Sequence, residues 1–255
     1  MKPPTRDDEF YIGYAPPMPP LLASFVRRSV IAIGLFLGVW AVVAATGHVR
    51  LEGGTFAFGH PEMVSGTIVA RPFPALMPDH DDARARPWPL LVAPGKHGAD
   101  SLVTGLDGRH VTFMGTRIER GAHAMIEIDP VSLESARQGE PAATATDAPQ
   151  TAAAARAVEL TGEIVDSKCF LGVMVPGSGK THKDCAALCL RGGIPPALHV
   201  RDRSGRSSLL LMTGASGESI SDQAQTLAGE ALVVTGTILR QAGWLVLRTD
   251  PGSWR

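Results

Sequence analysis

Three cysteines and one histidine stand close together in the C-terminal half of the chain, and these residue types bind soft metal ions. Cys169 is followed by His182, Cys185 and Cys189, in the pattern C-x12-H-x2-C-x3-C. Residues 183–190 are compatible with a helix, and the two glycines at 192 and 193 could end it. On that helix the histidine and the two following cysteines would share one face, which the first cysteine could reach from a preceding strand.

Three kinds of chemistry fit these four residues. A disulfide from Cys169 to either Cys185 or Cys189 would fasten the segment to its domain in an oxidising compartment. Alternatively, all three thiols and His182 would form a tetrahedral site for one zinc or copper ion. Thiol redox exchange is the third alternative, with Lys168 or His182 lowering a thiol pKa, although no C-x-x-C motif is present. The sequence leaves these alternatives open.

The elements that would position these residues are repeated along the chain. Residues 106–132 align without a gap with residues 227–253, and residues 65–69 match residues 161–165. Both copies combine β-branched runs with glycine-containing turns, which predicts a first strand, a middle strand and a hairpin in each. This order resembles the small OB-like barrels. The second copy carries about 25 additional residues, and all three cysteines lie in that insertion.

A long apolar segment precedes the repeats. Ser29–Thr46 contains 18 residues without a charge, which as a helix would extend about 27 Å, close to the thickness of a bilayer core. Arg27 and Arg28 precede it and favour a cytoplasmic N-terminus. We therefore predict a single transmembrane helix at 29–49 in a bacterial inner membrane, with the rest of the chain in the periplasm. A signal peptide cleaved near Val43-Ala44-Ala45 is the alternative, and export by the general or the twin-arginine route stays open.

Partners follow from the same segment and from the overall charge. Gly34 and Gly38 form a G-x-x-x-G pattern, and small residues at this spacing let a second helix approach closely. The pattern predicts a homodimer, or packing against other membrane-protein subunits, within the lipid bilayer. The net charge of −1 gives no electrostatic reason to expect nucleic acid as a partner.

The residues around the cysteines also allow a comparison. The pattern V-D-x-K-C at 165–169, followed by H-x-x-C-A-x-x-C at 182–189, resembles that of bacterial exported OB-like proteins of unassigned function. The likeness extends from Val158 to the C-terminus. It implies export and a Cys/His site, and it implies no activity.

These features predict a mainly β protein with one N-terminal transmembrane helix and two tandem OB-like small barrels. The predicted parts are a cytoplasmic tail at 1–28, the helix at 29–49, a first domain at 50–135, an Ala/Thr/Pro linker at 136–157 and a second domain at 158–255. No constellation of catalytic side chains stands out, so we expect an accessory or assembly subunit of a membrane-bound complex, for example a respiratory or electron-transfer one. The alternative is a periplasmic metal-binding or thiol-redox protein that works through the insertion.

Overall fold

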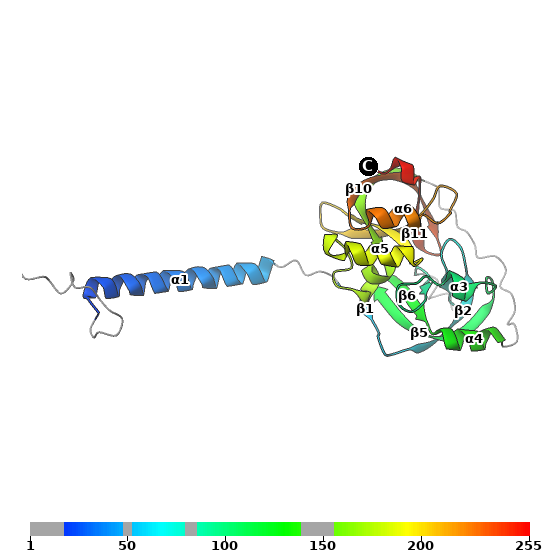
Figure 1. Cartoon of the computed structure of the whole chain (residues 1–255), viewed down its shortest axis with the longest axis horizontal. Helices are drawn as coiled ribbons and strands as arrows, with labels where there is room; N and C mark the ends of the chain where they lie inside the picture. Colours follow the sequence, from blue (N-terminus) through cyan, green and yellow to red (C-terminus); the bar gives the residue numbers. More distant parts are fainter. Residues whose placement is uncertain (1–17, 48–52, 80–85, 139–155) are drawn as a thin grey trace, which may run out of the picture. The chain divides into compact units, whose positions relative to one another are not determined.

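The computed structural model describes residues 18–47, 53–79, 86–138 and 156–255. They form two compact units, one of which holds the N-terminal helix and the other all of the β-strands (Figure 1). Most of the predicted tail at 1–28 and most of the predicted linker at 136–157 lie outside the described residues.

The first unit is a single helix, α1 (Pro20–Gly47). Proline suits the first turn of a helix, because the N–H group that it lacks would have no partner there. The stretch Pro20–Thr46 reaches a mean hydropathy of 2.2 and is not buried. It is long and apolar enough to cross a membrane, a property that an N-terminal signal sequence would share. The helix begins ahead of the predicted span at 29–49, so Arg27 and Arg28 lie within it.

Five strands close into a first barrel. They are β2 (Glu62–Val69), β3 (Ala75–Met77), β4 (Leu90–Val92), β5 (His110–Arg120) and β6 (His123–Ile128). Around the barrel the order is β5-β2-β3-β4-β6, and β6 pairs with β5 to close it. β4 and β6 run parallel, whereas the other neighbours are antiparallel. A short strand, β1 (Thr55–Phe56), adds to β5, and two helices, α3 (Asp100–Val103) and α4 (Pro130–Gln138), follow β4 and β6.

Five further strands close into a second barrel. They are β7 (Arg156–Asp166), β8 (Pro196–Arg201), β9 (Ser207–Thr213), β10 (Ala231–Gln241) and β11 (Trp244–Thr249). The order is β10-β11-β9-β8-β7, with β7 pairing to β10 and with β9 and β11 parallel. The insertion lies between β7 and β8 and forms η1 (Cys169–Val173), η2 (Lys180–His182) and α5 (Lys183–Arg191). Three short helices come later in the chain: α6 (Ser221–Ala224), η3 (Gln225–Leu227) and η4 (Pro251–Ser253).

The two barrels repeat one strand order, and the sequence repeat falls on equivalent strands. β5 and β10 begin 121 residues apart, as do β6 and β11. Gly66 on β2 and Gly162 on β7 occupy matching positions, where a Cβ atom would lie 2.5 Å and 2.8 Å from a backbone oxygen of the neighbouring strand. Glycine at these points therefore lets the strands curl tightly enough to close. The predictions of a mainly β chain and of two small barrels are confirmed.

The barrels share a hydrophobic core. One buried cluster joins Trp88, Leu90 and Met125 of the first barrel to side chains of the second, including Phe170 and Trp244. The indole Nε1 of Trp244 donates a hydrogen bond of 2.8 Å to the carbonyl oxygen of Trp88. Because this cluster is continuous across the junction, residues of the two barrels can form one site.

A candidate metal site between the barrels

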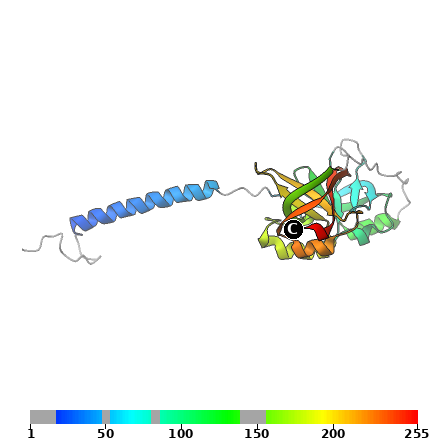
Figure 2. The same ribbon diagram turned by 90° about the horizontal axis from the view of Figure 1, so that it is seen from above.

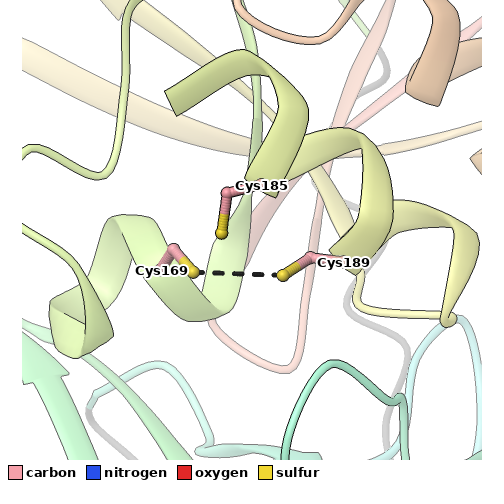
Figure 3. A group of neighbouring side chains, drawn as sticks. All are labelled: Cys169, Cys185 and Cys189. Atoms are coloured by element: carbon pink, nitrogen blue, oxygen red, sulfur yellow. Dashed lines mark hydrogen bonds between the residues drawn. The ribbon is translucent and has the colours of Figure 1, made fainter. Parts of the chain in front are cut away.

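The three cysteines converge on one point. Cys169 opens η1, directly after β7, while Cys185 and Cys189 lie one turn apart on α5 (Figure 3). Their sulfur atoms all lie within 4.8 Å of one another. Cys169 and Cys189 are buried, whereas Cys185 is half-buried. The group could hold a metal ion, because thiolates at this separation can bind a common centre.

None of the thiols is in a disulfide. All three are free, and the Sγ atoms of Cys169 and Cys189 are 4.0 Å apart. A disulfide would bring two sulfurs to about 2.05 Å. In this structure, therefore, the pairing of Cys169 with Cys185 or Cys189 is absent.

Local structure explains how α5 presents its two thiols. The helix packs on β7 through Ala186 and Leu190, and α5 and α6 lie side by side on the second barrel (Figures 1 and 2). Cys185 and Cys189, four residues apart, share the face that turns toward η1. The helix ends at Arg191, and Gly193 follows in the left-handed conformation with φ +90°. The glycine pair therefore ends α5 as the sequence indicates.

Lys96 reaches the thiols from the first barrel. Its Nζ lies 2.8 Å from the Sγ of Cys185 and 3.7 Å from the Sγ of Cys189. The loop that carries Lys96 follows β4 and lies against the end of α5, where a Cβ on Gly192 would be only 1.8 Å from the carbonyl oxygen of Lys96. Gly98 N also donates to the oxygen of Gly192 at 2.9 Å. The lysine as a whole is solvent-exposed, yet its ammonium group contacts the thiol cluster.

Lys168, which the sequence suggested as a modulator of a thiol pKa, bonds elsewhere. Its Nζ donates to the backbone oxygens of Ala93 and Gly95, at 2.9 Å and 2.7 Å. It also forms an ion pair of 2.5 Å with Glu127 on β6. A lysine of the second barrel is thus buried in the first, where it holds the loop that carries Lys96.

His182 lies beside the cluster and is paired with Asp166. Its Nε2 is 3.0 Å from a carboxylate oxygen of Asp166, and both side chains are buried. The second carboxylate oxygen accepts a hydrogen bond of 2.8 Å from the backbone N–H of Cys169. His182, Asp166 and Cys169 form a second group of candidate ligands, which shares Cys169 with the group of three thiols. Of the four predicted ligands, the described structure therefore gathers three in one group and places His182 next to Cys169 alone.

The charges around the thiols distinguish the two buried sulfurs. A hydrogen bond to Cys189 raises the pKa of the Cys169 thiol, and burial and the nearby Asp166 act in the same direction. The same hydrogen bond lowers the pKa of Cys189, and the positive charge of Lys96 adds to this effect. The bond to Cys185 raises the pKa of Lys96 in turn. Of the two buried thiols, Cys189 therefore has the lower pKa and loses its proton more readily than Cys169.

Gly34 and Gly38, the predicted packing residues, both lie on α1. A Cβ atom built on either would meet nothing within 4 Å in the described part of the chain. Both positions are thus open to a neighbouring helix, and their role in packing stays a prediction.

Comparison with family models, with curated proteins and with solved structures found no match to this chain.

Proposed function

We propose that this protein binds one thiophilic metal ion, zinc or copper, through Cys169, Cys185 and Cys189. The observation that carries the proposal is the approach of three free thiols to within 4.8 Å of one another. Soft thiolate ligands suit both metals. Among the two functions that the sequence suggested, the geometry favours this one over an accessory subunit without a site of its own.

The arrangement fits a metal better than a disulfide or thiol exchange. A disulfide uses two sulfurs, so it gives no reason for a third thiol and an ammonium group at the same point. Thiol exchange by a dithiol requires a second sulfur that can reach the bound partner, and of the three thiols only Cys185 is accessible. Asp166 fixes the backbone of Cys169 and holds His182 beside it. Such outer hydrogen bonds orient the ligands of metal sites.

We also propose that both barrels are OB-like. Counted in chain order, the strands of each barrel run first, second, third, fifth and fourth, with the third and fifth parallel. This order supports the assignment of both barrels as OB-like. A likeness to bacterial exported proteins with the V-D-x-K-C pattern agrees with that assignment and stays a hypothesis.

The proposed setting is the periplasmic face of a bacterial inner membrane. The apolar helix α1 would anchor the chain, and Arg27 and Arg28 near its start support a cytoplasmic N-terminus. An anchored metal-binding protein could serve as an accessory or assembly subunit of a membrane-bound complex. The open positions at Gly34 and Gly38 support contact with another helix.

Metal analysis with thiol counting tests the central proposal. The full chain would be purified in mild detergent under anaerobic, reducing conditions and supplied with zinc or copper. We expect one metal ion per chain and three thiols that a dye detects only after chelation or unfolding. The variant Cys189→Ser should lose the metal, whereas His110→Gln, which alters a histidine paired with Asp79 on the first barrel, should keep it.

Two results would refute the proposal. One is the absence of bound metal in protein with three reduced thiols. The other is a single free thiol in protein isolated without a reductant, with the remaining two joined as a disulfide.

A further inference from the structure

A charged group of the first barrel, the ammonium group of Lys96, contacts the thiol cluster. This ammonium group cannot be the fourth ligand of a metal, because it has no lone pair to give. Its Nζ lies 2.8 Å from the Sγ of Cys185 and 3.7 Å from the Sγ of Cys189, so its positive charge acts on any ion bound by these sulfurs. This arrangement favours some metals over others.

The number of donor atoms at the cluster limits which metal it can hold. Within the described residues, the group around the sulfurs contains three donors. His182 and Asp166 are 3.0 Å apart and bonded to each other, and they group with Cys169 rather than with all three thiols. Structural zinc sites are almost always tetrahedral with four protein ligands. A trio of thiolates instead suits Cu(I), a soft ion that accepts three sulfur ligands in a plane.

The net charge of the site also depends on the metal. Three thiolates around a monovalent ion carry a net charge of −2, and around a divalent ion −1. In a partly buried site, a nearby fixed cation stabilises the larger negative charge more strongly than the smaller one. Lys96 supplies that cation, and its backbone is held against Gly192 at the end of α5. Lys168 anchors the same loop through the backbone oxygens of Ala93 and Gly95.

We propose that the site binds Cu(I) in three-coordinate form, with Lys96 of the first barrel as a counter-charge in place of a fourth ligand. This inference rests on the proposed function and narrows it to one metal. Both barrels then contribute to the site, the second through its sulfurs and the first through its charge. Cys185, the half-buried thiol under Lys96, is the point at which the ion would reach the site from solvent.

X-ray absorption and metal competition test this inference on the full chain in detergent. Protein loaded anaerobically with Cu(I) should show three sulfur neighbours around copper and no nitrogen or oxygen neighbour. Cu(I) should displace zinc from zinc-loaded protein, and zinc should not displace Cu(I). A spectrum with a fourth ligand, or zinc that Cu(I) fails to displace, would overturn the inference.

Variants of Lys96 supply a second test. Lys96→Met should weaken Cu(I) binding by about tenfold, as expected for removing one partly screened charge close to the site. Lys96→Arg should keep most of the affinity, and Lys180→Met, at an exposed lysine of the insertion, should leave it unchanged. An unchanged affinity in Lys96→Met would overturn the role of the lysine.

The two proposals fail in different ways. Tight four-coordinate zinc would refute the choice of Cu(I) and leave the metal-binding proposal standing. Failure of the wild-type chain to retain either metal with its thiols reduced would refute both.

Discussion

The ion pair between Lys168 and Glu127 should stabilise the junction of the two barrels. The lysine side chain is 3% exposed and the glutamate side chain 19% exposed. Replacing Glu127 by Gln keeps the shape of the side chain and leaves the ammonium group buried without its counter-charge. Removing one partner of a buried pair typically costs about 3–5 kcal/mol.

The exposed part of Glu127 lets water compensate some of this loss. We therefore expect Glu127→Gln to lower the free energy of unfolding by about 3 kcal/mol, at the lower end of that range. For a unit of this size, each kcal/mol lowers the melting temperature by about 2–4 °C, so a decrease of roughly 6–12 °C is expected. Adding Lys168→Met should restore part of the loss, because the uncompensated charge is then gone.

Urea denaturation followed by tryptophan fluorescence is the assay, since Trp88 and Trp244 are buried at the junction. Glu230→Gln is the matched control. Its pair with Lys183 is nearly as short, at 2.6 Å against 2.5 Å, but both side chains are more than a third exposed. Glu230→Gln should therefore change the stability much less than Glu127→Gln, because water screens exposed ion pairs. Equal losses in Glu127→Gln and Glu230→Gln would refute the reasoning.

Three further predictions concern pH, thiol accessibility and the N-terminal helix. Burial, aided by Arg201 and Arg120, lowers the pKa of His199 to about 4. The unfolded chain binds this proton near pH 6.5, so unfolding titrations should show stability falling by up to about 3 kcal/mol as the pH drops from about 6.5 to 4. In alkylation followed by mass spectrometry, Cys185 should react first in the folded, metal-free protein, because the other two thiols are buried. The mature protein should keep α1 and resist extraction by alkaline carbonate.

Each of these predictions has a control or a contradicting result. His199→Leu should flatten the pH profile between 4 and 6.5, and an unchanged profile would exclude His199 as the cause. Simultaneous labelling of all three cysteines in folded protein would contradict the burial of Cys169 and Cys189. An intact mass that begins just after Ala45 would identify the apolar segment as a cleaved signal sequence.

Periodicity and repetition account for the parts of the fold that could be predicted from the sequence. The blocks at 106–132 and 227–253 contain β-branched runs around a turn, and they form the hairpins β5–β6 and β10–β11. β3 and β8 went unpredicted. β3 is only three residues long, and neither strand lies in the repeated blocks at 65–69, 106–132, 161–165 and 227–253. β3 and β8 form strands because neighbouring strands of the barrel pair with them, and their own residues do not predict a strand.

The candidate site was predictable only in part, because sequence separation hides some of its members. The spacing of Cys185 and Cys189 on one helix placed two thiols together, and Cys169 joined them as expected. Lys96 precedes Cys185 by 89 residues and belongs to the other barrel, so no local pattern connects the two. No structural role was predicted for Asp166, although its place three residues before Cys169 suits a cap on that residue's N–H.

The core shared by Trp88 and Trp244 limits how this duplicated chain can be divided. A fragment with only the second barrel would expose the face that Trp88 covers, and its Lys168 would have no acceptor. Each barrel thus covers apolar surface of the other, and we expect either half to aggregate when it is expressed alone.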